Sequence, residues 1–284
     1  DSTSGIWKIK TGCYATPGNN GFCLKMEDRT NLDLDSSSNA HTFTTSGTLT
    51  ATYDNPSNNF CTLGGEIRSP RQPTDYLNGN TTAYPTSTDI SVCGNLGMSK
   101  GAWYWETKVT IANNLNIGLV PAALINESGA TLMGWDQGSG NNALNADPSI
   151  GTRRAGNMYE KADGSQVATT TTSFVTGDII GLAFNATTGA FRLWKNGVEM
   201  TGSPYTLGDG NYATTWGTAG AILPGFRIDG AADTTKIECN FGNGYFGTTA
   251  VVSTNADAAG IGSFEYEVPA SHYALCTKNI KVYG

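Results

Sequence analysis

Apolar and polar residues alternate in short runs from about residue 100 onward, and this alternation predicts β-strands. The clearest run is Ala102–Ile111, in which Trp103 and Trp105 would share one face and Tyr104 and Glu106 the other. A period of two is the spacing of side chains along a strand, so one face of this run is expected to be buried. Runs of the same kind are Leu115–Leu124, Leu132–Trp135, Ile179–Phe184, Ala190–Lys195, Ile222–Ile228 and Thr235–Phe241.

The residues between these runs are typical of turns in antiparallel sheets. Asn196-Gly197 is flanked by apolar residues, and Asn-Gly is the strongest short hairpin signal because both residues tolerate positive φ. The stretch from Gly138 to Asn157 is rich in Gly and Asn, which predicts a long exposed loop. The sequence offers no helical crossovers between the strands, which argues against a parallel α/β sheet. The pattern therefore predicts an all-β chain folded as an antiparallel β-sandwich.

The first third of the chain is patterned less regularly. Short strand candidates are Gly5–Lys10, Phe22–Met26 and Thr42–Tyr53. Residues 64–88 contain prolines and show little periodicity, which is typical of a loop. We therefore expect three parts: a smaller β-rich segment over 1–63 that docks the chain or completes the sandwich, a loop or linker over 64–87, and the sandwich over 88–284.

Composition supports this fold class and narrows the function. Only 14% of the 284 residues are charged and 36 are Gly, which favours short strands joined by tight turns. The net charge of −7 argues against nucleic acid as a partner, because phosphate binding needs clustered Lys and Arg. No run approaches the roughly 18 apolar residues of a membrane-spanning helix, so membrane insertion is not expected. Because no signal peptide is recognised and the first residue is Asp1, we expect the chain to be processed or part of a longer polypeptide.

The cysteines give no sign of a metal site. The six of them, at positions 13, 23, 61, 93, 239 and 276, form no CxxC pair, and the chain has only two histidines. A zinc site is therefore not expected, nor is any cofactor, while the disulfide pairing is left open. Alternation places Cys239 on the same face as Ile237 and Phe241, so we expect several cysteines to be free and buried as small apolar residues.

Seven phrases in the second half resemble the strands of SPRY domains, and they occur in the family's order. They are Gly101–Val109, Asn116–Val120, Met133–Trp135, Gly177–Phe184, Phe191–Gly197, Leu223–Phe226 and Asn240–Gly242. The resemblance covers about 99–245 and implies a concanavalin A-like (lectin-like) jelly roll of two antiparallel sheets. It also implies a non-enzymatic binding module that contacts its ligand through loops at one edge of a rigid scaffold.

This implied loop surface supplies the candidate ligand-binding residues, which are Asp147, Arg153, Arg154, Tyr159 and Trp216. Trp and Arg are enriched at binding hot spots, and an exposed Trp216 would stack on a sugar ring. Two alternatives stay open: Trp216 packs inward as a loop anchor, and the arginine pair is solvated without a binding role. The strand tryptophans are expected in the core, and they are Trp103, Trp105, Trp135 and Trp194.

A weak calcium candidate lies where oxygen-bearing side chains alternate. Its members are Asp33, Asp35, Ser37 and Asn39. A calcium loop requires Gly at its sixth position and a bidentate Glu at its twelfth, where this chain has Ser38 and Thr44. An Asx-type turn is therefore the favoured interpretation, and no metal is expected.

An enzymatic function is not expected. Related jelly rolls hydrolyse glycans with paired carboxylates, and Glu265 and Glu267 are two residues apart. Pro269 and Ala270 stand where a third acid would be expected. The GxSxG elbow and the P-loop are also absent from the sequence.

Three flanking segments resemble virion proteins of tailed phages, and they are Phe22–Asp28, Asp54–Leu63 and Phe264–Thr277. The resemblance implies a tail fibre, spike or decoration protein at the virion surface. Its partners would be other virion proteins and a host-surface glycan or receptor, and we expect a homo-oligomer such as a trimer. We therefore expect host attachment as the function. The alternatives are a capsid decoration or head-fibre protein, and a cellular adhesion or protein-binding SPRY module.

Overall fold

The computed structural model describes residues 13–47, 49, 51–68, 74–86, 90–111, 114–123, 148–162, 165–229 and 235–284. The chain divides into two compact units, Asp1–Asn59 and Phe60–Gly284. Within the described residues, no helix is long and apolar enough to cross a membrane.

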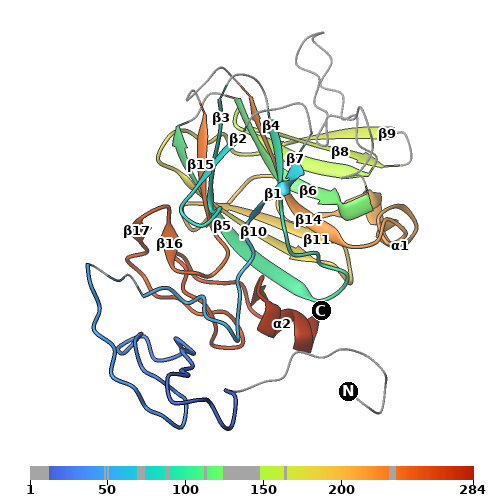
Figure 1. Ribbon diagram of the computed structural model, residues 1–284. Coiled ribbons are helices and arrows are strands. Elements are labelled where there is room, and N and C mark those ends of the chain that lie inside the picture. Colours follow the sequence, from blue (N-terminus) through green and yellow to red (C-terminus); the bar gives the residue numbers. More distant parts are fainter. Residues whose placement is uncertain are drawn as a thin grey trace. The chain divides into compact units, whose positions relative to one another are not determined.

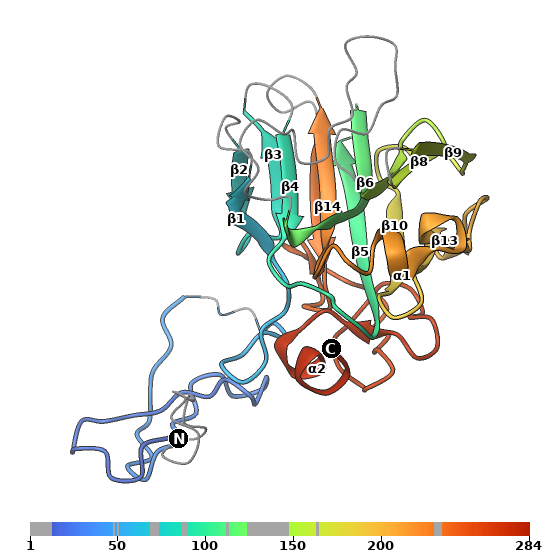
Figure 2. The ribbon, with the colours of Figure 1, turned by 90° about the vertical axis from the view of Figure 1, so that its right-hand side faces the viewer.

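The second unit is a β-sandwich of two antiparallel sheets (Figure 1 and Figure 2). The smaller, seven-stranded sheet has the order β1 (Leu63–Arg68), β4 (Ile90–Gly94), β14 (Ile222–Asp229), β6 (Asn114–Pro121), β7 (Ser149–Arg153), β8 (Asn157–Ala162) and β9 (Ser165–Thr170). The larger sheet has the order β12 (Val198–Glu199), β11 (Ala190–Lys195), β10 (Ile179–Asn185), β5 (Ala102–Ile111), β15 (Lys236–Asn240), β3 (Thr82–Pro85) and β2 (Thr74–Leu77). Two short strands extend it, β13 (Tyr205–Thr206) beside β11 and β18 (Tyr273–Ala274) beside β5.

The remaining elements are short. They are the 3-10 helix η2 (Leu207–Gly210), the helices α1 (Tyr212–Thr215) and α2 (Thr277–Tyr283), and the hairpin of β16 (Tyr245–Phe246) and β17 (Thr249–Ala250). The predicted fold class, an all-β antiparallel sandwich, is thus confirmed.

Strand β5 lies in the centre of the larger sheet, and its alternation decides which face is buried in the sandwich. Trp103 and Trp105 are fully buried, and their cross-strand partners on β10 are Phe184 and Leu182. The core-facing residues of the smaller sheet are all 1% exposed or less and are Ile90, Val92, Leu115, Ile117, Leu119, Phe226 and Ile228. Burial of large apolar side chains on both inner faces is the main stabilising term of such a sandwich.

The predicted linker is wrong, because residues 63–85 supply strands to both sheets. Strand β1 pairs with β4 of the smaller sheet, while β2 and β3 extend the larger sheet beyond β15. The sequence of this region does not alternate between apolar and polar residues, so it gave no sign of strands. In β3, for example, the polar Thr82 and the apolar Ala83 are neighbours and both are buried. The predicted loop 138–157 is also partly wrong, because Ser149–Arg153 forms β7 and β8 begins at Asn157. The strand candidates Gly5–Lys10 and Leu132–Trp135 lie outside the described residues.

The first unit contains no β-strand in its described residues, which contradicts the predicted β-rich segment. Its only ladder contacts there are isolated bridges, Leu24 with Asp35 and Asn55 with Asn58. Order comes instead from a disulfide between Cys13 and Cys23 and from the buried carboxylate of Asp35. The local sequence is too polar to form the half-buried face that a stable strand needs.

The C-terminal part of the chain covers the outer face of the larger sheet. The carboxylate of Glu106 on β5 accepts hydrogen bonds from the backbone N–H groups of Glu265 (2.9 Å) and Tyr266 (2.8 Å). The ring of Phe264 packs edge-on against Tyr104, 5.2 Å between centroids. Burial raises the pKa of Glu106 to about 7, although its hydrogen-bond donors act in the opposite direction. A buried carboxyl group beneath the segment thus forms hydrogen bonds that hold the segment in place.

A candidate binding surface on the smaller sheet

The outer face of the smaller sheet carries a continuous row of polar side chains. Because residues opposite each other in register lie on the same face, the strand pairing alone defines this row. Arg227 on β14 is paired with Ser91 on β4 and with Asn116 on β6. Asn116 is in turn paired with Arg153 on β7, and Arg153 with Asn157 on β8. We call these five residues the polar row.

The middle of the polar row is buried. Ser91 and Asn116 are each 1% exposed, and Arg227 is 5% exposed, whereas Arg153 and Asn157 at the other end are half-buried. Asn116 Nδ2 and Ser91 Oγ have no hydrogen-bond partner among the described residues. A buried polar atom without a partner costs about 1–3 kcal/mol. Such atoms are uncommon in folded proteins and call for an explanation.

Next to the polar row runs a strip of three glycines that are paired with one another. Gly225 on β14 lies opposite Gly118 on β6, and Gly118 lies opposite Gly151 on β7. Tyr159 on β8 ends the strip, because it is the partner of Gly151. We call Gly225, Gly118 and Gly151 the glycine strip. A Cβ atom at Gly118 would overlap the carbonyl oxygen of Ile150, so this position requires glycine. The strip carries no side chains of its own, yet all three glycines are buried.

Two of the candidate residues from the sequence meet at the edge of this surface. The guanidinium of Arg153 lies 5.9 Å from the ring centroid of Tyr159, within the range of a cation–π contact. Arg154 follows in the turn between β7 and β8 and is half-buried. Asp147 lies outside the described residues. The structure therefore brings Arg153 and Tyr159 together, and Arg153 is paired in register with Asn116 and Asn157.

Trp216, in contrast, is not on a binding surface. Its side chain is 0% exposed, and its Nε1–H donates to Glu160 Oε1 at 2.7 Å. Glu160 also accepts hydrogen bonds from the Tyr205 hydroxyl and from the backbone N–H of Gly208 (2.6 Å). Since Glu160 is on β8 and Tyr205 is on β13, this carboxylate links the smaller sheet to the larger one. The interpretation of Trp216 as an inward-packed loop anchor is therefore the one that the structure bears out.

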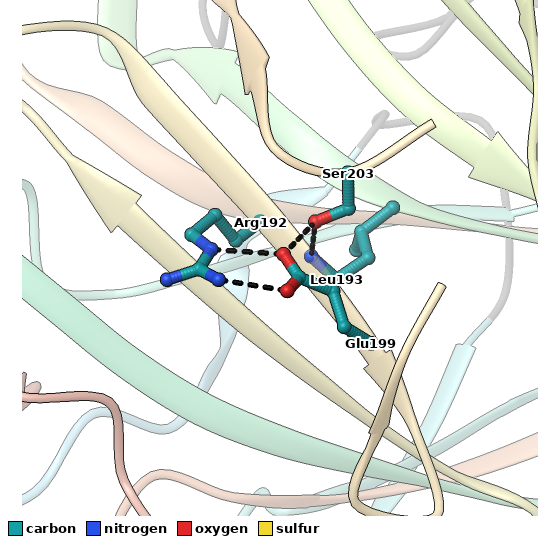
Figure 3. A network of polar contacts seen from close by, with 4 residues as sticks. All are labelled: Arg192, Leu193, Glu199 and Ser203. Atoms are coloured by element: carbon teal, nitrogen blue, oxygen red, sulfur yellow. Dashed lines mark hydrogen bonds and ion pairs between the residues drawn. The ribbon is translucent and has the colours of Figure 1, made fainter. Parts of the chain in front are cut away.

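A second polar cluster lies on the outer face of the larger sheet, and its charges are balanced internally. Arg192 donates to both carboxylate oxygens of Glu199, at 2.9 and 2.8 Å, and Ser203 Oγ donates to the same carboxylate at 2.8 Å (Figure 3). Hydrogen bonding from Arg192 lowers the pKa of Glu199. The guanidinium also lies 5.0 Å from the ring of Trp194. The cluster fixes the β11–β12 hairpin and leaves no unmatched charge of its own.

Trp194 departs from the sequence-based expectation. It is half-buried on the outer face of β11, whereas Phe191 and Leu193 of the same strand enter the core. Trp103 and Trp105 are in the core as predicted, and Trp135 lies outside the described residues. The outward position of Trp194 could have been predicted from alternation along β11. Successive strand residues point to opposite faces, so Trp194 lies on the face opposite to the buried Leu193.

The weak calcium candidate is a turn whose oxygens already accept hydrogen bonds. Asp35 accepts from the backbone N–H groups of Cys23, Ser37 and His41, and also from Ser37 Oγ. These donors lower the pKa of Asp35 against the effect of burial. Asn39 donates to the carbonyl oxygens of Gly18 and Gly21. The Asp35 carboxylate thus accepts hydrogen bonds from N–H and O–H donors, as expected for the Asx-type turn that the sequence favoured.

The two acids considered for hydrolysis, Glu265 and Glu267, lie in a segment without regular secondary structure. Glu265 accepts a hydrogen bond from the backbone N–H of Val252 at 2.7 Å, and Glu267 is exposed. Residues 265–267 do not form a strand, so the expected common direction of the two side chains is not imposed by the backbone.

Sequence reasoning missed Ser91, Asn116 and Arg227. A signal for them was present, because each alternates with fully buried apolar neighbours along a strand: Ser91 with Ile90 and Val92, for example. A polar residue at alternate positions of an otherwise apolar strand marks the outer face. The register between strands that are far apart in sequence, which aligns these residues, is known only from the fold.

Comparison with known proteins finds matches among solved structures. No family model and no curated protein matches the chain. Among solved structures, the SPRY domain of human HERC1 is similar, with 14% sequence identity and a TM-score of 0.44. The match covers 62% of this chain and 96% of that domain. The sandwich architecture itself is established by the strand order and pairing of the two sheets.

Proposed function

We propose that this chain is a non-enzymatic binding module whose ligand is held by the polar row over the glycine strip. The observation that carries this proposal is the pair of buried, unpartnered polar atoms, Asn116 Nδ2 and Ser91 Oγ. They lie in register on either side of Arg227, on the central strands of one sheet. Groups of this kind are retained at a cost in stability, and ligand recognition is a common reason for that cost.

The scaffold supports such a role because its binding face is carried by strands. Strands β4, β14 and β6 are each hydrogen-bonded on both sides, so their positions are fixed before a ligand arrives. A site on rigid elements loses little entropy on binding. A ligand would reach the polar row from Arg153 and Asn157, where the side chains are half-buried.

For the biological setting, we propose a virion-surface protein that contacts a host-surface ligand, with other virion proteins as structural partners. What supports this is the resemblance of the flanking segments to tailed-phage virion proteins, together with the low charge content of the chain. Several copies in a homo-oligomer would raise a weak single-site affinity by about 10²–10⁴ through avidity.

The experiment is a binding screen with the purified chain on a glycan array and on host cells. It compares the wild-type protein with Asn116→Leu, which removes the amide but keeps a similar volume. A matched control is Thr218→Val in the exposed turn after α1, which removes one exposed polar group that is not part of the polar row. We expect wild type and Thr218→Val to bind and Asn116→Leu to lose binding while keeping its cooperative unfolding. Binding that is unchanged in Asn116→Leu would overturn the proposal.

A further inference from the structure

The strands at the edges of the two sheets differ in how they are protected from pairing with other chains. The edges are β1 and β9 in the smaller sheet and β2 and β12 in the larger sheet. Charged residues on an edge strand oppose pairing with a further strand. The sequence of β9, Ser-Gln-Val-Ala-Thr-Thr, contains none. The other three edges do contain them: Glu66 and Arg68 in β1, Asp75 in β2 and Glu199 in β12.

Half of the backbone groups of β9 point away from the sheet. The N–H of Thr171, directly after β9, donates to the carbonyl oxygen of Gly156, directly before β8, at 2.9 Å. Because successive strand residues direct their backbone groups to opposite sides, every second residue of β9 also faces β8. The residues in between direct their N–H and C=O groups away from β8, and they are Gln166, Ala168 and Thr170.

Only the first part of this edge is open. A Cβ atom at Gly202 would lie 2.6 Å from the carbonyl oxygen of Thr170, so the chain at Gly202 lies against the far end of β9. At Gln166 and Ala168, β9 has no strand on its outer side within the described residues. Ala168 is exposed, and Val167 is 44% exposed. The accessible edge is therefore a short stretch with Val167 at its centre.

We infer that β9 pairs antiparallel with β9 of a second copy of this chain, with Val167 opposite Val167 of the second copy. In this register Gln166 lies opposite Ala168 of the second copy, and their outward N–H and C=O groups form hydrogen bonds across the axis in both directions. The two valines form the pair without hydrogen bonds, whose Cα atoms approach to about 4.5 Å, so their side chains pack together. A register centred on Ala168 would need the outward groups of Thr170, which Gly202 covers.

The lack of charge on β9 favours an identical strand as the partner. Each copy carries a net charge of −7, and an uncharged contact strand adds no like-charge pair across the axis. A foreign peptide takes its specificity from pockets for alternate side chains, whereas an identical strand needs only the exposed Val167 to meet its copy. Each copy has one β9, so the pairing closes at a two-fold dimer. The inference does not depend on ligand binding by the polar row.

The first test measures dimerisation of the purified chain by sedimentation equilibrium. Wild type is compared with Val167→Lys and with the control Val252→Lys, which adds the same charge at a position that is 89% exposed and outside any strand. Wild type and Val252→Lys should dimerise with a Kd on the order of 10–100 μM, because so short an edge buries less than the ~1,200 Å² of a standard interface. Val167→Lys should dimerise on the order of 10-fold or more weakly, because like charges would face each other across the axis.

The second test reads the register through disulfide formation between copies. Val167→Cys, Ala168→Cys and Val252→Cys are incubated with oxidised glutathione, and covalent dimers are followed on non-reducing gels. The introduced thiols of Val167→Cys face each other within bridging distance, whereas the Cα atoms at the introduced positions of Ala168→Cys are more than about 7 Å apart. Val252→Cys gives the rate of crosslinking through random collisions. Val167→Cys should crosslink on the order of 10-fold faster than the other two variants.

Three results would overturn the inference. The first is a wild-type chain that stays monomeric at about 1 mM, where a dimer with a Kd of about 100 μM would be mostly formed. The second is unchanged dimerisation of Val167→Lys, and the third is faster crosslinking of Ala168→Cys than of Val167→Cys. Thermal unfolding shows whether each variant is folded, and if Val167→Lys is not, the cysteine variants decide. All three results leave the proposed function standing, because its test is the dependence of ligand binding on Asn116.

Discussion

Glu106 and Tyr266 are 160 positions apart in the sequence, yet the Glu106 carboxylate accepts a hydrogen bond from the Tyr266 backbone N–H at 2.8 Å. The same carboxylate is also bonded to Tyr104 Oη, Asn240 Nδ2 and the backbone N–H of Glu265. It is fully buried between β5 and the segment that covers it. Stability should therefore depend on the protonation state of one carboxyl group.

The first prediction follows from the pKa of Glu106, which burial raises from 4.5 to about 7. Between these values the folded protein binds a proton that the unfolded chain releases. The contribution of Glu106 to stability is therefore fully present below about pH 4.5 and is lost as the pH rises to about 7. The loss should be on the order of 2–3 kcal/mol. Denaturant unfolding of wild type and Glu106→Gln at several pH values measures it.

The comparison with Glu106→Gln is needed because His272 acts in the opposite direction. Burial lowers the pKa of His272, so its contribution to stability grows as the pH rises through the same region. The difference between wild type and Glu106→Gln cancels this contribution, since both proteins keep His272. A difference that does not change with pH would show that Glu106 titrates normally and that its burial has no electrostatic consequence.

The second prediction concerns Asn116. Asn116→Leu should raise the free energy of unfolding by about 1 kcal/mol, because it replaces a buried amide nitrogen that lacks an acceptor with an apolar group of similar volume. Ser91→Ala should have a smaller effect in the same direction. Chemical denaturation checks both variants. A loss of several kcal/mol in Asn116→Leu would mean that the amide has a structural partner in solution.

The third prediction concerns Trp216 and Glu160. Trp216→Phe keeps an aromatic ring but removes the Nε1–H that donates to Glu160 at 2.7 Å. Leaving this buried carboxylate with one donor fewer should cost about 1–3 kcal/mol of stability. Ligand binding by the folded variant should be unchanged, because Trp216 is an anchor and not a contact. Selective loss of binding with full stability would contradict this assignment.

The fourth prediction concerns the cysteines. Cys61, Cys93, Cys239 and Cys276 are buried thiols that form no disulfide in the part of the chain that the structure describes, and burial raises the pKa of Cys61 and of Cys93 to about 12. A thiol reagent at pH 8 should therefore label no cysteine in the native protein. It should label four after denaturation and six after reduction, which breaks the Cys13–Cys23 disulfide. Mass spectrometry gives the count, and rapid labelling of the native protein would contradict the burial of these thiols.

Much of the sandwich core could be predicted from the sequence because it depends on local alternation. Trp103 and Trp105 face the core, and Cys239 is buried with Ile237 and Phe241, as the period of two requires. The strands β1, β2 and β3 could not be predicted, since their burial comes from neighbours far along the chain. Strand β3, for instance, pairs with β15, more than 150 positions later.

The candidate surface was predictable only at one of its ends. Arg153 and Tyr159 were singled out by residue type and by their place after a polar stretch, and both lie on or beside the polar row. Ser91, Asn116 and Arg227 come from strands that are distant in sequence, and only the sheet register aligns them. Trp216 was a candidate that the structure removes from the surface. Its Gly- and Thr-rich surroundings suggested exposure, but a hydrogen bond to the buried carboxylate of Glu160 on β8 holds it inside.

The short strand β18 fills a place beside β5 that β15 leaves open, as Tyr273 and Ala274 pair with Trp103 and Tyr104. The central strand of the larger sheet is therefore completed by residues synthesised about 170 positions later. During translation, β5 is made long before β18. Until β18 is made, the edge of β5 at Trp103 and Tyr104 is unpaired and can pair with other chains. We expect folding to be slow and to finish only once this late segment has left the ribosome.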